Sequence, residues 1–258
     1  MTEELADSIA RARALVSSAT RITVLTGAGI STDSGIPDFR GPQGVWTKNP
    51  EAEKLATLQH YLADPEVRRR AWQNRLHSTH WAAEPNHGHR TLVALESSGR
   101  MLGLVTQNVD GLHQLAGSDP ERVVEVHGTM RYSRCWDCGD RLPMAEVLVR
   151  VREGEADPPC RECGGILKSD TISFGQSLVP EVIDQAMFLA DTCDLLLAVG
   201  TSLQVYPVAN MVPRARSVGA AIVIVNGEAT KMDRFADVVL RGPIAELLPR
   251  LVERSDLP

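Results

Sequence analysis

The sequence predicts an α/β protein in which a parallel sheet is covered by helices on both faces, with a smaller second lobe. Two observations lead to this prediction: short, fully apolar runs alternate with helical patterns along the chain, and two segments interrupt that alternation. The chain has 258 residues, of which 43% are hydrophobic and 23% are charged. That length and composition are typical of one large globular domain that carries insertions.

Six short β-branched or leucine-rich runs are the predicted strands. Most are apolar at consecutive positions, which is typical of strands buried on both faces. The runs are Ile22–Leu25, Leu102–Thr106, Val123–Val126, Leu195–Val199, Ala221–Val225 and Val238–Leu240. Helical patterns lie between them, and several begin with proline, which suits a first helical turn. The predicted helices are Leu5–Ser18, Pro65–Ser78, Gly88–Glu96, Pro180–Ala190, Val208–Val218 and Pro243–Val252. This alternation predicts a parallel sheet between two helical layers.

Two segments break the alternation and are predicted to form the small lobe. Residues 40–82 show helix and loop patterns without a strand signal, and residues 129–170 hold two C-x-x-C pairs around a helical stretch, "MAEVLVRVREG". We therefore expect a large domain made of residues 1–39, 83–128 and 171–258. The small lobe would combine a helical insertion, 40–82, with a cysteine-containing module, 129–170.

The first predicted strand runs into the stretch "TGAGISTDSGIPDFRGP". Glycines at Gly27 and Gly29 allow backbone N–H groups to approach a pyrophosphate, as in the phosphate-binding turn of a Rossmann-like dinucleotide site. A tight turn between a strand and a helix is the structural alternative. The usual dehydrogenase pattern is not completed, because Thr32 occupies the position of its third glycine and a loop rich in glycine and proline follows.

Small or polar residues follow five of the predicted strands. Ligands of open α/β sheets bind beyond the carboxyl ends of the strands, so these residues should meet at one edge. They are Thr26–Gly29, Thr106–Asp110, His127–Gly128, Gly200–Ser202 and Asn226–Glu228. Any one of these segments alone is explained as a loop, and Glu228 alone as a solvated acid. Together they predict a ligand site, in which Glu228 can accept hydrogen bonds from ribose hydroxyls.

The cysteines predict a zinc ribbon. Cys135 and Cys138 form one C-x-x-C pair, Cys160 and Cys163 form a second pair 21 residues later, and a glycine follows each pair directly. Four thiolates fill a tetrahedral shell and leave no open position for water, so one structural Zn²⁺ is expected. A redox dithiol or a disulfide is the alternative. Cys193 stands apart and is predicted to be a small core residue.

Charge argues against a nucleic-acid surface. The net charge is -6, and the predicted zinc-ribbon module, where DNA binding is conceivable, has a net charge of about -1. No apolar run approaches the 18 residues or so that a membrane-spanning helix needs, and the start "MTEELADSIA" lacks the features of a signal peptide. We therefore expect a cytoplasmic protein that binds neither nucleic acid nor membrane.

His127 is the candidate general base. It ends a buried strand and is followed by glycine, which we interpret as clearing space for a ligand. A neutral imidazole with a pKa near ~6.5 can act as a base at neutral pH. Zinc ligation is not expected, because the four cysteines already complete a shell. Most histidines are simply surface or core residues, which is the alternative here.

Taken together, these stretches closely resemble the sirtuin family of NAD-dependent protein deacylases. The matching stretches are "TGAGISTDSGIPDFRG", "TQNVDGLHQLAG", "VHG", the two C-x-x-C pairs, "SFGQ", "GTSLQVYP" and "VNGEAT". They occur in the family's order and extend from residue 26 to about residue 230. The resemblance explains the unusual glycine turn, because in sirtuins this turn binds NAD pyrophosphate. The loop rich in glycine and proline that follows it is, in sirtuins, a mobile loop that closes over the nicotinamide ribose.

The resemblance implies a set of NAD-binding residues. Asn108 and Asp110 would hold the nicotinamide carboxamide, and Phe39 would serve as a lid that excludes water. The implied cofactor-binding residues are Gly27, Ala28, Gly29, Ser31, Asp38, Phe39, Arg40, Gln107, Asn108, Asp110, Gly200, Thr201, Ser202, Asn226, Gly227 and Glu228. The implied catalytic residues are His127, Asn108 and Asp110.

The implied reaction is deacetylation of acetyl-lysine in a protein or peptide. The acetyl group passes to ADP-ribose, and nicotinamide and 2′-O-acetyl-ADP-ribose are released, with His127 as base towards the ribose hydroxyls. A water-poor site is required, because water would otherwise hydrolyse NAD. Three alternatives stay open: removal of other acyl groups such as succinyl, mono-ADP-ribosylation of a protein, and a non-catalytic NAD-sensing zinc scaffold.

By the same resemblance the substrate lies as an extended strand between the lobes. Its backbone would pair with Ser173, Phe174 and Gly175 on one side and with Gln204, Val205 and Tyr206 on the other. The chain departs from the common family pattern at Lys168–Asp170 and at Gln176, which we place beside this groove.

Acyl preference is the last expectation. Some desuccinylating sirtuins carry Tyr-x-x-Arg on the helix before an "EPN" stretch, where the arginine grips a carboxylate. Here the nearest match is Trp72–Arg75, and an indole cannot replace the phenol. An amphipathic helix with Trp72 packed inward is the structural alternative. We expect acetyl-lysine to be preferred.

Overall fold

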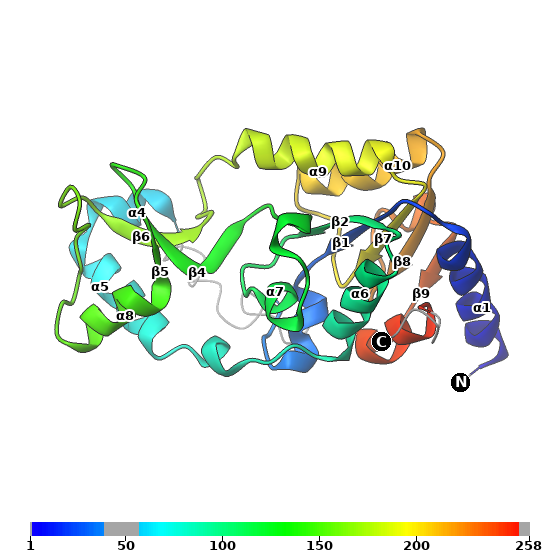
Figure 1. Ribbon diagram of the computed structural model, residues 1–258, viewed down its shortest axis with the longest axis horizontal. Coiled ribbons are helices and arrows are strands. Elements are labelled where there is room, and N and C mark those ends of the chain that lie inside the picture. Colours follow the sequence, from blue (N-terminus) through cyan, green and yellow to red (C-terminus); the bar gives the residue numbers. More distant parts are fainter. Residues whose placement is uncertain (1, 39–56, 253–258) are drawn as a thin grey trace.

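The structure is a computed structural model that describes residues 2–38 and 57–252 (Figure 1). Its larger part is built on a six-stranded sheet with the order β3-β2-β1-β7-β8-β9, in which every neighbouring pair is parallel. This is the strand order of a doubly wound Rossmann sheet. The strands are β1 (Ile22–Thr26), β2 (Met101–Thr106), β3 (Val123–Glu125), β7 (Leu195–Val199), β8 (Ala221–Val225) and β9 (Val238–Leu240).

Helices cover both faces of this sheet, as predicted. Figure 1 shows α9 and α10 on one face, and α1, α6 and α11 on the other. The helices of this part are α1 (Glu3–Ser18), α6 (His87–Ser97), α7 (Leu112–Ala116), α9 (Pro180–Thr192), α10 (Met211–Ser217) and α11 (Ile244–Leu247). Short 3₁₀ helices connect them: η1 (Ala28–Ser34), η3 (Pro120–Arg122), η4 (Val208–Asn210), η5 (Asp233–Phe235) and η6 (Leu248–Arg250).

The continuous apolar character of the strands follows from this two-sided burial. Side chains of successive strand residues point to opposite faces, so Leu195 and Leu197 pack with α1 and α6, whereas Leu196 and Ala198 pack with α9 and α10. All four side chains have no exposed surface. At about 25 cal/mol per Å² of buried apolar area, such two-sided strands are the main source of stability of this part.

The smaller part holds a three-stranded antiparallel sheet in the order β5-β4-β6. Its strands are β4 (Gly128–Cys135), β5 (Arg141–Pro143) and β6 (Leu167–Thr171). Its helices are α4 (Leu58–Ala63), α5 (Pro65–Leu76), η2 (Thr79–Ala82) and α8 (Met144–Arg152). Figure 1 shows this sheet and these helices together at the end of the molecule away from the N-terminus.

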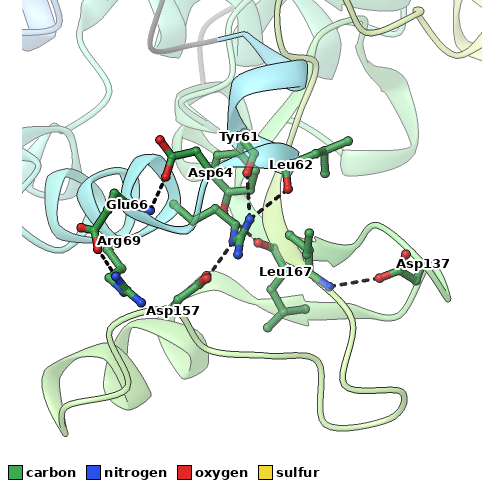
Figure 2. Close-up of polar contacts among 10 residues, drawn as sticks. Tyr61, Leu62, Asp64, Glu66, Arg69, Asp137, Asp157 and Leu167 are labelled. Atoms are coloured by element: carbon green, nitrogen blue, oxygen red, sulfur yellow. Dashed lines mark hydrogen bonds and ion pairs between the residues drawn. The ribbon is translucent and has the colours of Figure 1, made fainter.

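The two interrupting segments of the sequence share one small core. Trp72 of α5 has no exposed surface and packs with Met144, Val147 and Leu148 of α8 and with Leu167 of β6. Polar contacts reinforce this packing (Figure 2).

The Arg68 guanidinium joins the helical segment to the cysteine-containing segment through hydrogen bonds. It donates to Asp157 at 2.7 Å and to the carbonyls of Tyr61 and Leu62 at 3.2 and 3.0 Å, while the Tyr61 hydroxyl donates to the Leu167 carbonyl at 2.8 Å. The helical segment and the cysteine-containing segment therefore pack as one unit.

The structure differs from the predicted helices in three places. The pattern 208–218 divides into η4 and α10, and the pattern 243–252 gives only the short helices α11 and η6, because Pro249 lies in η6 and cannot donate a helical hydrogen bond. The helix α7 was not predicted, since five residues give too little periodicity. None of the helices within residues 2–38 and 57–252 is both long and apolar enough to cross a membrane.

Candidate active site and metal centre

A cavity of about 1100 Å³ lies at the carboxyl ends of the large-sheet strands and extends to the small lobe. It collects most of the predicted site residues: Gly27, Ala28, Gly29, Asp38, Gln107, Asn108, His127, Ser173, Phe174, Gly175, Gly200, Thr201, Ser202, Gln204, Val205, Tyr206, Asn226, Gly227 and Glu228 all line it. Ser31 and Asp110 do not line it and lie behind the wall. Phe39 and Arg40 fall outside the described residues.

The glycines of the first turn are required by close backbone packing. A Cβ at Gly27 would lie 2.7 Å from the Thr201 Cβ, and a Cβ at Gly29 would lie 2.9 Å from the Gly200 Cα. The Gly29 N–H donates to the Gly200 carbonyl at 2.8 Å. The turns after β1 and β7 therefore press against each other. Close packing of these two turns, without any role in phosphate binding, is therefore sufficient to explain both glycines.

Asn108 and Asp110 form a buried network with Ser31. The Asn108 side-chain amide donates to the Gly27 carbonyl at 3.1 Å and to Ser31 Oγ at 3.2 Å. Ser31 Oγ donates to one Asp110 oxygen at 2.8 Å, and the Leu112 N–H donates to the other at 2.9 Å. Asn108 and Asp110 are 7% and 6% exposed. The network fixes the Asn108 amide at the cavity wall, and Asp110 acts on that wall from behind.

His127 lies between the two sheets, after β3 and directly before β4. Its Nδ1 is 2.9 Å from the Gln107 carbonyl, which can only accept, so Nδ1 carries the proton and Nε2 keeps its lone pair. Burial lowers the pKa of His127, although the hydrogen bond to Gln107 opposes that shift. The imidazole is therefore neutral at neutral pH and can accept a proton at the cavity.

The glycine after His127 has a different cause from the one expected. Gly128 has a φ of +71°, and a Cβ there would lie 2.1 Å from the Asp170 carbonyl oxygen. Space for the backbone of β6 therefore explains this glycine, and the interpretation that it clears space for a ligand was wrong. The close β4–β6 approach also lets the Ile172 N–H donate to the His127 carbonyl at 2.8 Å.

Gln107 and the later strand ends complete the large-domain side of the cavity. The Gln107 amide donates to Thr201 Oγ1 at 2.9 Å, which ties the ends of β2 and β7 together. Asn226 donates through its side chain to the Glu228 backbone carbonyl at 2.8 Å. Glu228 is exposed and lines the cavity.

The expected peptide groove is partly occupied by the chain itself. The Phe174 carbonyl accepts from the Leu58 N–H at 2.9 Å, and Thr57 forms a parallel bridge with Phe174. The Val205 carbonyl accepts from the Ala209 N–H at 2.9 Å. These two carbonyls are therefore engaged. Tyr206, with a side chain that is 61% exposed, stands open to solvent at the cavity wall.

The Lys168–Asp170 segment does not line the cavity, contrary to the placement expected from the sequence. Lys168 is buried, its Nζ donates to the Ser169 carbonyl at 2.9 Å, and burial lowers the pKa of its ammonium to about 8. The Asp170 carboxylate forms ion pairs with the Arg134 and Arg141 Nε atoms, each at 2.7 Å. These residues stabilise the small sheet. Gln176 does line the cavity, as expected.

The end of the cavity in the small lobe contains residues that the sequence did not single out together. Arg75 lines the cavity with Tyr61, and its Cζ lies 5.9 Å from the Tyr61 ring centroid and 5.1 Å from that of Trp72. One Arg75 nitrogen, Nη1, is buried without a hydrogen-bond partner. Trp72 packs inward, as the amphipathic-helix alternative states. Tyr61 was missed because it lies on a separate helix, 14 positions before Arg75.

The four predicted cysteines gather at one point of the small lobe. Their sulfur atoms all lie within 4.8 Å of one another, with Cys135 Sγ 3.5 Å from Cys163 Sγ and Cys138 Sγ 3.7 Å from Cys160 Sγ. Tetrahedral Zn²⁺ with bonds of about 2.3 Å separates its sulfur ligands by about 3.8 Å. All four cysteines are free thiols in the structure, so the disulfide alternative is not realised.

Glycines shape the two turns that carry these cysteines. Gly139 and Gly164 have φ values of +77° and +76°, and each N–H donates back to the carbonyl of the first cysteine of its pair, at 3.1 and 2.9 Å. This left-handed conformation is readily adopted only by glycine. The glycine after each pair, seen in the sequence, is thus part of the geometry that directs both sulfur atoms of a pair to one point.

Comparisons with known proteins agree with this site. The model described as the Sir2 family matches residues 27–207. The chain is 51% identical over 231 residues to "NAD-dependent protein deacetylase 2" of Streptomyces coelicolor, covering 90% of this chain and 96% of the relative. It is 44% identical over 240 residues to "NAD-dependent protein deacetylase" of Sulfolobus acidocaldarius, covering 92% and 91%.

Solved structures show the same likeness. One described as "Structural Basis for the Mechanism and Regulation of Sir2 Enzymes" has a TM-score of 0.85 and 36% identity, and the match covers 97% of this chain and 98% of that one. A structure of Sir2Tm bound to a propionylated peptide has a TM-score of 0.84 and 28% identity, with coverage of 97% and 99%.

Proposed function

This chain belongs to the Sir2, or sirtuin, family and is an NAD-dependent protein deacetylase, and from that premise we propose which residues bind NAD and acetyl-lysine and which act in the reaction. When bound, NAD supplies the ADP-ribose that accepts the acetyl group as nicotinamide leaves. The products are the free lysine, nicotinamide and 2′-O-acetyl-ADP-ribose.

The large-domain wall of the cavity is the proposed NAD site. The turns at 27–29 and 200–202 are proposed to hold the pyrophosphate, with the N–H groups of Ala28, Thr201 and Ser202 as donors. The N–H groups of Gly27, Gly29 and Gly200 already donate to the carbonyls of Val199, Gly200 and Val225. The Glu228 carboxylate, which is exposed at the cavity edge, would accept from the adenosine ribose. Asp38 and Gln107, which also line the cavity, would contact the nicotinamide ribose. Phe39 and Arg40, which lie outside the described residues, are proposed to close over it.

Asn108 and Asp110 are proposed to prepare the nicotinamide pocket. The Asn108 amide is held by Gly27 and Ser31, so its orientation is fixed before the ligand binds. A fixed dipole needs no reorganisation during the reaction. Asp110, which lies behind the wall, acts on the pocket by holding Ser31 and the start of α7.

His127 is the proposed general base. Its Nε2 lone pair accepts a proton from the ribose hydroxyls as the acetyl group moves to the sugar, while the Gln107 carbonyl holds the Nδ1 proton. The neutral, oriented imidazole on the cavity wall is the single observation that carries this assignment, because a protonated or rotated ring could not accept the proton.

The small-lobe side of the cavity and the Gln204–Tyr206 loop are the proposed groove for the acyl-lysine protein. Gly175 is proposed to offer backbone groups to an extended peptide. The backbone groups of Ser173 are both engaged by Gln176, and the Phe174 carbonyl is engaged by Leu58. This pairing carries little sequence preference. We further propose one structural Zn²⁺ on the four cysteines, the division into a large domain and two insertions given above, and a cytoplasmic location without nucleic-acid or membrane partners.

The decisive experiment supplies NAD and an acetyl-lysine peptide and weighs the products by mass spectrometry. Free lysine peptide with 2′-O-acetyl-ADP-ribose in equal amounts is the expected result. Protein labelled with ADP-ribose would instead support mono-ADP-ribosylation, and NAD binding without turnover would support an NAD-sensing scaffold.

A further inference from the structure

Two buried histidines lie behind the Asn108 wall. His89 on α6 and His113 on α7 are 0% and 1% exposed, and their ring centroids are 5.0 Å apart with an angle of 59° between the ring planes. His89 Nε2 and His113 Nδ1 are both buried and have no hydrogen-bond partner. Such atoms are rare in native proteins, and the presence of two in neighbouring rings calls for a physical account.

The tautomer of His89 follows from the start of α6. The backbone N–H of Asn86 donates to His89 Nδ1 at 3.3 Å, as the second half of a capping box in which the Asn86 side chain accepts from the first turn. Because Nδ1 accepts, the proton of the neutral ring is on Nε2. Burial lowers the pKa of His89 to about 4, so the ring is neutral at neutral pH. The unpartnered atom of His89 is therefore a donor.

The tautomer of His113 follows from two threonines. Thr26 Oγ1 donates to Thr106 Oγ1 at 2.8 Å, and it lies 3.0 Å from His113 Nε2. A hydroxyl has one proton, so with that proton on the Thr106 side His113 Nε2 is the donor to Thr26. Burial lowers the pKa of His113 to about 3, so its Nδ1 is a bare lone pair. The unpartnered atom of His113 is therefore an acceptor.

This pair connects to the candidate active site. Thr106 Oγ1 accepts the backbone N–H of Asn108 at 3.1 Å, and the two threonines face each other at the ends of β1 and β2. At the other end, the Asn86 side chain donates to the Ile30 carbonyl at 2.7 Å, in the 3₁₀ helix that follows the glycine turn. The chain of contacts thus extends from the glycine turn, behind the cavity, to the backbone of Asn108.

We propose that small ring rotations bring His89 Nε2–H to His113 Nδ1, a hydrogen bond that neither ring makes in the structure, where the ring centroids are 5.0 Å apart. The two histidines then form one neutral relay, and His113 is a positioning residue for Asn108. The relay satisfies both unpartnered atoms, since one is a donor and the other an acceptor. It holds Asn108 through the Thr26–Thr106 pair without contacting any substrate. This inference rests on the proposed role of Asn108 in the nicotinamide pocket.

The relay itself is tested without turnover, by NMR on the ligand-free protein with ¹⁵N-labelled histidine. The expected result is that both rings are Nε2–H tautomers between pH 5.5 and pH 7.5, with a scalar coupling between His89 Nε2 and His113 Nδ1. Spectra of His89→Asn and His113→Gln assign the signals. A His113 ring protonated on Nδ1, or a pair without coupling, would overturn the relay.

The positioning role is tested by steady-state kinetics and by exchange of labelled nicotinamide into NAD. His113→Phe keeps a ring of similar shape but loses both nitrogens, whereas His113→Gln restores a donor where Nε2 stood. We expect His113→Phe to lower kcat and the exchange rate by about three- to tenfold, the usual scale for one hydrogen bond, with KM for NAD changed less than about twofold. His113→Gln should recover most of that loss. Equal losses in the two variants would overturn the positioning role.

Matched variants separate the relay from the helix cap. His89→Asn keeps an acceptor near Nδ1 for the Asn86 N–H but removes the Nε2 donor, and it should also slow nicotinamide exchange. His87→Asn makes the same change at an exposed position of the same helix and should be neutral. A His89→Asn exchange rate equal to that of His87→Asn would contradict the relay.

A double-mutant cycle distinguishes the proposed connection to Asn108 from a general loss of stability. Thr106→Val removes the link to Asn108, so His113→Phe should have little further effect on exchange in that background, while additive losses would contradict the connection. Asn108→Ala is the separate test of the proposed function. Full turnover in that variant would remove the proposed role of Asn108, whereas the tautomer measurement would still decide on the histidine pair.

Discussion

The large domain and the small lobe are stabilised in different ways. The large sheet is packed on both faces, with Leu195 to Val199 supplying alternate side chains to two separate cores. Within the residues that the structure describes, the small lobe has one core of eight buried residues, two of which are Cys135 and Cys160. A core of that size contributes little stability by itself, so small modules of this kind depend on metals or similar cross-links.

This difference predicts which mutations should affect the chemical step and which should affect the substrate side of the site. His127, Asn108 and the glycine turn lie at the edge of the self-sufficient large sheet. The wall that would hold the acyl-lysine is supplied partly by the small lobe, through Tyr61 and Arg75. Chemistry should therefore follow the large domain and its internal hydrogen bonds, whereas the integrity of the substrate side should follow the cysteine cluster.

Loss of the metal is the largest expected effect. In Cys160→Ser the sulfur set is incomplete, so the small lobe should unfold and deacetylation should fall below detection, although no cysteine lines the cavity. Zinc is measured by elemental analysis and turnover by mass spectrometry of the peptide. The matched control is Cys193→Ser, a buried thiol of the large domain, which should retain zinc and activity. Full turnover in a zinc-free Cys160→Ser protein would show that the two parts are less different than described.

Removal of the base should be the next largest effect. His127→Ala should lower kcat by ~10²–10⁴, the usual scale for a lost general base, while NAD binding measured by calorimetry stays nearly unchanged. In the wild type, the lowered pKa of His127 places the acid limb of the pH–rate profile below pH ~6.5, so activity falls as pH drops through that lower value. Joint loss of NAD binding and turnover would assign His127 a structural role.

Acid should weaken the large domain through its buried histidines. His113 has a folded pKa of about 3, below its unfolded value near ~6.5, so the unfolded state binds the extra proton first. The free energy of unfolding is therefore highest above pH ~6.5 and is lost as pH falls, by roughly 1.4 kcal/mol per pH unit from this residue. Urea unfolding at pH 7.0 and pH 5.5 measures the loss, and the pH dependence should be about 1.3 kcal/mol smaller in His113→Phe. Identical pH dependence in both proteins would contradict the neutral state of His113.

Acyl preference is the smallest expected effect. We expect acetyl-lysine to give a higher kcat/KM than succinyl-lysine on one peptide. The Tyr61 hydroxyl already donates to the Leu167 carbonyl, so Arg75 would be left as the one partner of this pair for the carboxylate of a succinyl group. Arg75→Met should lower the remaining succinyl turnover by about tenfold, as expected for a charge-assisted hydrogen bond, and acetyl turnover by less. Succinyl turnover ten times the acetyl rate, reversed by Arg75→Met, would contradict this preference.

The strand pattern, the turn residues and the cysteine spacing were sufficient to predict the fold and the family. Consecutive apolar residues in Leu195–Val199 indicate a strand buried on both faces, and the six-stranded parallel sheet confirms it. The two C-x-x-C pairs predicted a four-sulfur cluster, and all four sulfur atoms do come together. These features are local or strictly periodic, so each can be recognised without knowing its neighbours.

Contacts between distant segments could not be predicted in this way. Position 128 requires glycine because the Asp170 backbone packs against it. Position 27 requires glycine because Thr201, which is 174 positions away, packs against it. In the same way Tyr61 meets Arg75, and His89 meets His113, only after separate helices have packed. The sequence determines which residues are buried and where the chain turns. Which buried polar atoms face each other depends on packing at the scale of tenths of an ångström, and only the tertiary structure decides that.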